Sequence, residues 1–200
     1  MEELPAIEVT KKSGNEVFHS SGKPLTFNLM SFWQWSSSDL VGNALRGMFA
    51  EFIVASAVGC TVDTRKEWDA FDIETHDGIK IEVKSAAYVQ SWSQKKLSSI
   101  QFGIQPTQGW DASSNTYSVE TVRQSDIYVF CVLSHKNKET IDPLNLDQWE
   151  FYVIDTDTLN RSVRNQKSIV LSRLKKLGPH KVTYEDIAST VKRVKGIIRS

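Results

Sequence analysis

The residues best suited to catalysis are an acid and a lysine two positions apart, Glu82 and Lys84, in the segment IKIEVKS (79–85). On a β-strand such side chains point to the same face, so a carboxylate and an ammonium would lie side by side. Mg²⁺ takes oxygen ligands from one or two carboxylates, and a lysine can stabilise charge that develops on a phosphate. The pair therefore indicates phosphate chemistry with a divalent cation. The alternative is an exposed strand with cross-strand ion pairs, each worth about 0.2–1 kcal/mol.

A β-hairpin over residues 68–85 is predicted to position this pair. Apolar and acidic residues alternate over FDIE (71–74), with the period of two expected of a half-buried strand. Asp77 and Gly78 form a turn dipeptide, because both accept the positive φ that tight hairpin turns require. Asp72 then lies on the strand opposite the acid–lysine pair and could supply a second carboxylate to the same cation.

A helix is predicted from about Asp39 to Val58, before Gly59. Residues at steps of three and four share one face of a helix. The face expected to point inward consists of Leu40, Ala44, Gly47/Met48, Glu51 and Ala55. An acid on that side needs a partner, because burying an unpaired charge is costly. Glu51 is therefore expected either to form a salt bridge with Arg46 or another basic residue, or to be a further acid of the metal site.

Strands and turns fill most of the remaining sequence. Short strands are predicted over residues 6–10, 16–19, 25–28, 98–104, 126–133, 149–154 and 168–171, and a last helix over 184–198. The run DIYVFCVL (126–133) is almost continuously apolar and reads as a central buried strand. Residues 105–125 are rich in turn-forming residues and are predicted to be a long loop. This order of elements predicts an α/β (α+β) fold, a sheet flanked by helices.

Composition is that of a soluble globular protein. The 200 residues are 40% hydrophobic and 24% charged, with a formal net charge of zero. No apolar run approaches a membrane span, and the start MEELP lacks the basic residues of a secretory signal, so a cytoplasmic protein is expected. Cys60 and Cys131 are far apart and form no CxxC pair, which argues against a zinc site or a disulfide framework.

Charge is distributed unevenly along the chain. Residues 161–200 hold eleven Lys and Arg against two Asp and Glu, whereas residues 1–160 hold thirteen against twenty-two. The basic C-terminal part is either a solvated helix face or a surface that contacts phosphates.

A helix with a glutamate, then an aspartate, then Glu-x-Lys on the next strand resembles the PD-(D/E)xK nuclease superfamily, which has the restriction endonuclease-like fold. The matching segments are RGMFAEFIVASAVG (46–59), WDAFDI (68–73) and IEVKSAAYVQSW (81–92). The resemblance implies a single domain with a mixed central sheet flanked by helices. Within it we expect an N-terminal arm (1–30), a catalytic core (38–155) and a basic helical part (160–200).

The resemblance also implies roles for individual residues. Asp72 and Glu82 would be the metal-binding carboxylates, Lys84 the catalytic lysine, and Glu51 a supporting acid that binds a second metal ion or a metal-bound water. No proline precedes the aspartate, which departs from the superfamily pattern. Asp69 therefore competes with Asp72, which is preferred because it lies in the alternating strand.

Four further residues are candidates for contact with substrate. Ser85 and Gln90 follow the catalytic strand, where such enzymes sometimes carry polar groups that contact substrate. Trp92 and Trp110 are predicted to border a nucleic-acid groove, although closing an edge of the hydrophobic core is an equally good account of both tryptophans.

These observations predict a Mg²⁺-dependent endonuclease, with Mn²⁺ as an alternative ion, that hydrolyses DNA phosphodiester bonds in restriction or other defence. The family also implies a homodimer, since restriction-type enzymes of this fold often cut duplexes as dimers. Two alternatives stay open. One is an inactive nucleic-acid-binding or assembly module on the same fold, and the other is an unrelated structural α/β protein whose acids form surface ion pairs.

Overall fold

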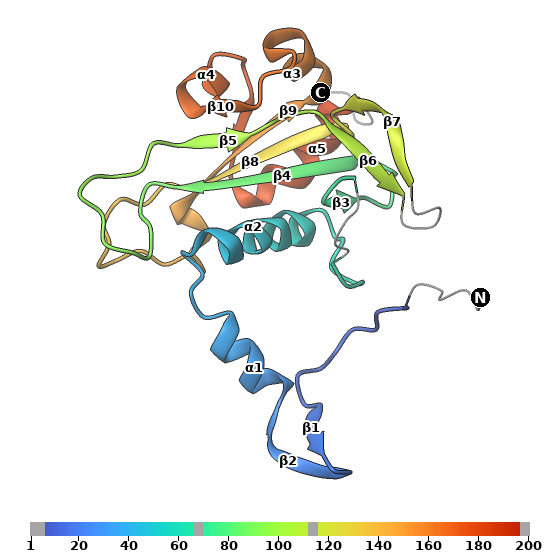
Figure 1. Ribbon diagram of the computed structural model, residues 1–200. Helices are drawn as coiled ribbons and strands as arrows, with labels where there is room; N and C mark the ends of the chain where they lie inside the picture. Colours follow the sequence, from blue (N-terminus) through green and yellow to red (C-terminus); the bar gives the residue numbers. More distant parts are fainter. Residues whose placement is uncertain (1–6, 66–69, 112–115, 197–200) are drawn as a thin grey trace.

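The computed structural model describes residues 7–65, 70–111 and 116–196. Its central sheet consists of β3 (Ile73–Glu74), β4 (Lys80–Ala87), β8 (Ile127–Leu133), β9 (Trp149–Asp155) and β11 (His180–Val182). The strand order is β11-β9-β8-β4-β3, with β4 and β8 parallel and every other neighbouring pair antiparallel. The expectation of a mixed central sheet is confirmed (Figure 1).

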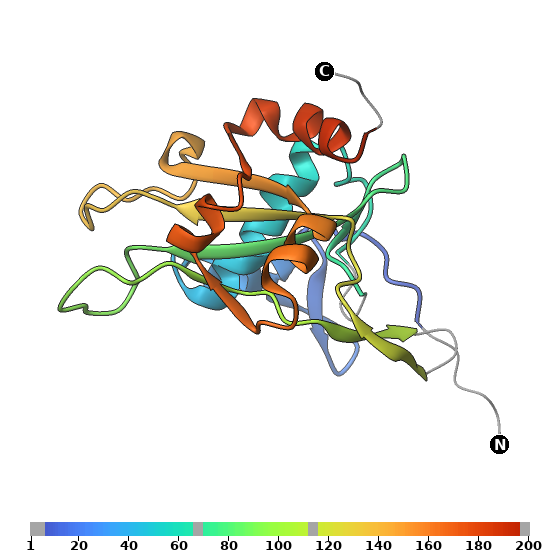
Figure 2. The same ribbon diagram turned by 90° about the horizontal axis from the view of Figure 1, so that it is seen from above.

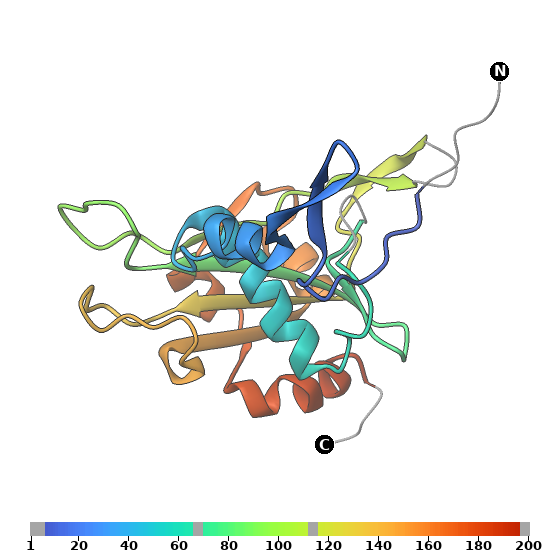
Figure 3. The same cartoon turned by 90° about the horizontal axis from the view of Figure 1, so that it is seen from below.

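Helices cover both faces of this sheet. The α-helices of the described part are α1 (Leu29–Ser36), α2 (Asn43–Ala57), α3 (Thr156–Val163), α4 (Leu171–Lys175) and α5 (Ile187–Val194). Single 3₁₀ turns, η1 (Leu146–Gln148) and η2 (Tyr184–Asp186), precede β9 and α5. Figure 2 shows α3 and α4 in front of the strands, and Figure 3, from the opposite side, shows α2 crossing in front of them. None of the helices in the described ranges is long and apolar enough to cross a membrane.

Two hydrophobic cores lie on either side of β8, as the prediction of a buried central strand requires. All seven β8 residues are buried. Because successive strand residues point to opposite faces, Val129 and Cys131 enter the core beneath α2 and α5. Tyr128 and Phe130 enter the second core, which α3 and α4 cover.

The predicted hairpin forms, but its first strand is short. Only Ile73 and Glu74 pair with β4 as a ladder. Gly78 has φ +74°, the left-handed conformation expected of the turn. On β4, Ile81 and Val83 are buried against α2, as the alternation predicts.

The inward face of α2 differs from the prediction. Ala44 and Met48 are exposed, and the buried residues are Arg46, Ala50, Ile53 and Val54. Apolar residues occur on almost every side of this helix, so their spacing did not fix which side packs. An arginine turns inward because its guanidinium finds hydrogen-bond acceptors there.

The prediction of a loop over residues 105–125 is wrong. This segment contains β6 (Thr107–Asp111) and β7 (Thr116–Val122), an antiparallel pair that projects from the body (Figure 1). The described side chains of β7 are all exposed, so the pair lacks the buried apolar face that usually marks a strand. Nearby, β5 (Gln101–Gly103) pairs with β10 (Ser168–Val170), which confirms both as strands shorter than expected.

The two ends of the described chain also differ from expectation. Strands β1 (Val17–Ser20) and β2 (Lys23–Asn28) are present, but residues 7–10 form no strand. The aromatic segment that follows is a helix, α1, which was not predicted. Strand β11 was also missed, because three residues between two helical segments carry too little periodicity to recognise.

Candidate active site

Glu82 and Lys84 lie on one face of β4, as their spacing predicts. Lys84 Nζ donates a hydrogen bond to Glu82 Oε1 and forms an ion pair with it. Both side chains are partly accessible, with 19% of the Glu82 and 31% of the Lys84 side chain exposed. The pair is therefore held by the strand yet open to a ligand.

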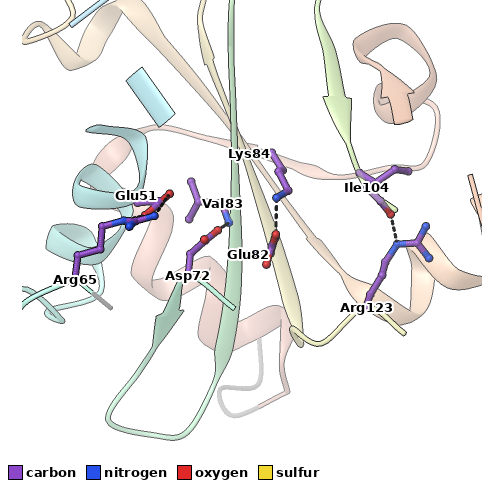
Figure 4. A network of polar contacts seen from close by, with 8 residues as sticks. All are labelled: Glu51, Arg65, Asp72, Glu82, Val83, Lys84, Ile104 and Arg123. Carbon is purple, nitrogen blue, oxygen red and sulfur yellow. Dashed lines mark hydrogen bonds and ion pairs between the residues drawn. The ribbon is translucent and has the colours of Figure 1, made fainter. Parts of the chain in front are cut away.

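Asp72 reaches the same region from the edge of the sheet. Its backbone N–H donates to the Ile81 carbonyl at 3.1 Å, so Asp72 continues the pairing of β3 with β4. Its Oδ2 accepts a 2.7 Å hydrogen bond from the Val83 N–H. That amide would otherwise be an unpaired donor on a strand edge. The carboxylate thus takes the place of the backbone carbonyl that a neighbouring strand would offer. It lies between Glu82 and α2 (Figure 4).

The environment of Asp72 disfavours its charge. Burial raises the pKa of Asp72 to about 7, and the negative charges of Glu82 and Glu51 act in the same direction. The Val83 N–H and the Lys84 ammonium oppose this increase only in part. A cation next to Asp72 and Glu82 would relieve the repulsion between the two carboxylates.

A cleft of about 610 Å³ opens over the two carboxylates. Its lining consists of Ala70, Asp72, Glu82, Thr107, Gln108, Trp110 and Tyr117. The last four belong to the β6–β7 hairpin, in which Trp110 and Tyr117 are directly opposed, with ring centroids 4.8 Å apart. The hairpin thus forms one wall of the cleft and brings an aromatic pair to the acids.

Glu51 lies on α2, on the other side of Asp72 (Figure 4). Arg65 Nε donates to Glu51 Oε2 at 2.5 Å, and Arg65 Nη2 donates to Oε1 at 3.2 Å. The salt bridge that the sequence left open therefore exists, with Arg65 in place of Arg46. Glu51 is still near enough to raise the pKa of Asp72.

Ser85 and Gln90 bond to the buried guanidinium of Arg46. Arg46 Nε donates to Ser85 Oγ at 3.3 Å, and Nη1 donates to Gln90 Oε1 at 3.2 Å. Gln90 is only 5% exposed, and its Nε2 donates to the Ala87 carbonyl at 2.9 Å. This geometry gives Gln90 a role in the packing of α2 against the segment that follows β4.

The two tryptophans lie in different places. Trp110 lines the cleft, whereas Trp92 belongs to the segment after β4, does not line the cleft and is 52% exposed. The Trp92 carbonyl accepts a hydrogen bond from Lys138 Nζ. Asp69, the competitor of Asp72, lies outside the described residues.

Arg123 is a residue of the site that the sequence did not single out. It directly follows β7 and is 8% exposed. Its Nε donates to the Ile104 carbonyl at 2.8 Å, and its Nη1 donates to Asn160 Oδ1 at 2.6 Å (Figure 4 shows the first contact). Because Ile104 precedes β6 and Asn160 is in α3, this side chain anchors both ends of the hairpin to the body.

The acids are suited to an ion bound by few protein ligands. Within the described ranges, no group of three or more His, Cys, Asp and Glu side chains could hold a metal ion. Mg²⁺ commonly binds one or two carboxylates and completes its shell with waters and substrate phosphates. Asp72 and Glu82, two oxygen donors with partly uncompensated charge, fit that requirement.

Other site residues gave weak signals in the sequence. Thr107, Gln108 and Tyr117 belong to a hairpin that was predicted as loop. The alternation in TYSVETV (116–122), with its β-branched and aromatic residues, is the signal that could have identified it. Arg65 gave no signal, because nothing in its local sequence connects it with Glu51.

Comparison with known proteins gives one family. The family model described as bacteriophage T4 endonuclease IV matches residues 2–173. No curated protein matches the chain. The match covers all of the residues that form the cleft.

Proposed function

The chain belongs to the bacteriophage T4 endonuclease IV family, and from this premise we propose that it is a metal-dependent endonuclease that hydrolyses DNA phosphodiester bonds at Asp72, Glu82 and Lys84. The observation that carries the proposal is that Asp72 and Glu82 both line one open cleft and that Lys84 donates a hydrogen bond to Glu82. Restriction or other defence against foreign DNA is the proposed setting.

Asp72 and Glu82 are the proposed ligands of Mg²⁺, with Mn²⁺ as a substitute. When bound there, the ion would neutralise phosphate charge and lower the pKa of a coordinated water. The bond from Val83 to Asp72 Oδ2 holds the carboxylate in one orientation, so little reorganisation is needed when the ion binds.

Lys84 is the proposed catalytic lysine. Its ammonium donates a hydrogen bond to Glu82, a residue that lines the cleft. We assign it to holding a water by hydrogen bonding or to stabilising the negative charge that grows on the phosphate oxygens. Removal of Lys84 takes away a positive charge from the reacting centre but no ligand oxygen.

Glu51 is the proposed supporting acid. Arg65 fixes its carboxylate and compensates its charge, and Glu51 still acts electrostatically on Asp72. We assign it to orienting a metal-bound water or a second ion.

The β6–β7 hairpin is the proposed wall against which DNA lies. Trp110 and Tyr117 offer it an aromatic surface, and Thr107 and Gln108 offer hydrogen-bonding groups. Of the two tryptophans considered from the sequence, Trp110 is assigned to DNA. Ser85 remains a minor candidate, because it is partly exposed next to Lys84.

The order helix, hairpin, parallel β4–β8 pair and antiparallel β9 supports assignment to the PD-(D/E)xK superfamily. The decisive experiment is plasmid cleavage by the full chain with Mg²⁺ and with EDTA, together with the Lys84→Ala and Glu82→Ala proteins. We expect cleavage only by the unaltered chain with the ion. Full cleavage by the Glu82→Ala protein would overturn the proposal.

A further inference from the structure

An N-terminal segment stands clear of the body and buries almost none of its apolar side chains. This segment, here called the arm, is residues 17–36 and comprises β1, β2 and α1; Figure 1 shows it projecting below α2. None of its residues is buried. A two-stranded hairpin is marginal in water, and an isolated eight-residue helix is unstable. The arm therefore needs a surface that covers it.

The exposed apolar side chains of the described residues concentrate in the arm. Nineteen large ones are exposed, and seven of these lie in the arm. The seven and their exposed fractions are Val17 45%, Phe18 39%, Leu25 37%, Phe27 46%, Met30 41%, Phe32 46% and Trp35 83%. An aromatic side chain can bury roughly 150–250 Å², so the four aromatic ones alone leave about 400 Å² uncovered.

Charge argues against nucleic acid or a membrane as the covering surface. Lys23 is the one lysine, arginine or acid among the twenty residues of the arm. DNA-binding surfaces neutralise several phosphates with several lysines and arginines, and helices that lie on membranes carry basic residues on their polar face. The arm has neither, so its partner is another apolar protein surface.

The body of the chain offers such a surface on α2. Ala44, Met48 and Phe52 recur at steps of four and share the outward face of that helix, here called the α2 stripe. All three are exposed, Met48 by 41% and Phe52 by 58%. The arm does not fold back onto the stripe of its own chain (Figure 1), and both ends of the arm are ordered by local hydrogen bonds.

The first connection precedes β1. There Glu16 accepts hydrogen bonds from the Ser13 and Gly14 N–H groups, both at 2.9 Å, and the Met30 N–H donates to the Gly14 carbonyl at 2.8 Å. The second connection joins α1 to α2. There Asp39 Oδ1 accepts from the Gly42 N–H at 2.9 Å, and the Ser37 N–H donates to the Trp33 carbonyl at 2.8 Å. These bonds order the two ends of the arm.

We propose that two copies of the chain form a symmetric dimer in which the arm of each copy packs on the α2 stripe of the other. Such an exchange is isologous, since the same two surfaces meet twice. Twenty arm residues from each copy match the 20–30 residues that a standard interface uses on each side. Two arms cover about 800 Å² of aromatic surface, and the two stripes add to this. The proposal is independent of the nuclease assignment.

The test is the mass of the full chain in solution without DNA, measured by light scattering over a range of concentrations. The unaltered chain, of 22.6 kDa, is expected at twice that mass. Phe32→Glu with Trp35→Glu in the arm, and separately Met48→Glu with Phe52→Glu in the stripe, should each give monomers. Trp92→Glu with Leu97→Glu, at exposed apolar residues elsewhere, should remain dimeric.

A mixing experiment tests the pairing itself. The Trp35→Lys and Phe52→Glu proteins should each be monomeric alone and should dimerise when mixed, because the new lysine then meets the new acid at one contact and the other contact is native. Melting curves confirm that each variant is folded. A monomeric unaltered chain, a dimer that survives the arm changes, or a dimer that survives the stripe changes would each overturn the proposal.

Discussion

The Asp72 carboxylate accepts a 2.7 Å hydrogen bond from the Val83 N–H, the amide between the two residues of the Glu82–Lys84 pair. β3 has just two residues in its ladder, so the side chain of Asp72 supplies the acceptor that a longer strand would have supplied from its backbone. The same bond fixes a half-buried carboxylate beside the negative charge of Glu82. Two carboxylates that repel each other, Asp72 and Glu82, are thus held side by side at the edge of the sheet, where both line the cleft.

The first prediction follows from that repulsion. The pKa of Asp72 is about 7 in the folded protein, against an ordinary value of 3.8. Between about pH 4 and pH 7 the folded state therefore binds more protons than the unfolded state, so this group's contribution to stability falls as pH rises. Without metal, Asp72→Asn should raise the free energy of unfolding at pH 8 by about 2–4 kcal/mol, and by almost nothing near pH 4.

Thermal melts of both proteins in EDTA over this pH range measure the difference. Mg²⁺ should then stabilise the unaltered chain more than the Asn variant, because a ligand stabilises only the state that binds it. A gain from Asp72→Asn that grows on acidification would contradict the account.

The second prediction separates binding of the ion from catalysis. Lys84→Ala should reduce cleavage at least about 100-fold, the cost of removing a charge-stabilising group from a transition state, while the affinity for Mn²⁺ measured by calorimetry stays within a few-fold. Glu82→Ala should lose both. Equal loss of Mn²⁺ affinity in the two variants would show that Lys84 organises the ligands and is not confined to catalysis.

The third prediction concerns the aromatic wall of the cleft. Trp110→Ala should weaken DNA binding in EDTA by about tenfold, the scale of an aromatic anchor at an interface, with little change in melting temperature because Trp110 is partly exposed. Trp92→Ala is the control, since Trp92 is exposed outside the cleft. A large loss of stability in Trp110→Ala with unchanged DNA affinity would assign this tryptophan to packing.

Sequence reasoning succeeded where one periodicity dominated. The alternation around Glu82 and Lys84 fixed their common face, and the apolar run of β8 fixed the centre of the sheet. It did not identify a partner that is distant in the chain. Glu51 pairs with Arg65, fourteen residues away, and no local pattern distinguishes that arginine from Arg46.

The hairpin β6–β7 shows a second kind of failure. Its described residues face solvent or the cleft, so the alternation in TYSVETV (116–122) is its one weak signal, and turn-forming residues such as Gly109 suggested a loop. The arm shows a third. No element was predicted for its aromatic segment, and the structure places Trp35 in α1, with 83% of the residue exposed.

The last prediction concerns Arg123, which positions the hairpin without lining the cleft. Its bonds to the Ile104 carbonyl and to Asn160 fix the base of β6–β7. Arg123→Ala should loosen the hairpin, raising KM for DNA about tenfold, while kcat changes less because Asp72, Glu82 and Lys84 are unaltered. Arg123→Lys should recover only part of the affinity, since one ammonium cannot replace a guanidinium that binds two acceptors in a fixed geometry.

The matched control for Arg123 is Arg46→Ala. Arg46 is also buried, but its bonds hold α2 to β4 and to the segment that follows it and do not reach the hairpin. Both alanine variants should lower the melting temperature, whereas only Arg123→Ala should also expose the hairpin to limited proteolysis and raise KM. If both variants changed KM alike, or if Arg123→Ala lowered kcat and left KM unchanged, Arg123 would not act through the hairpin.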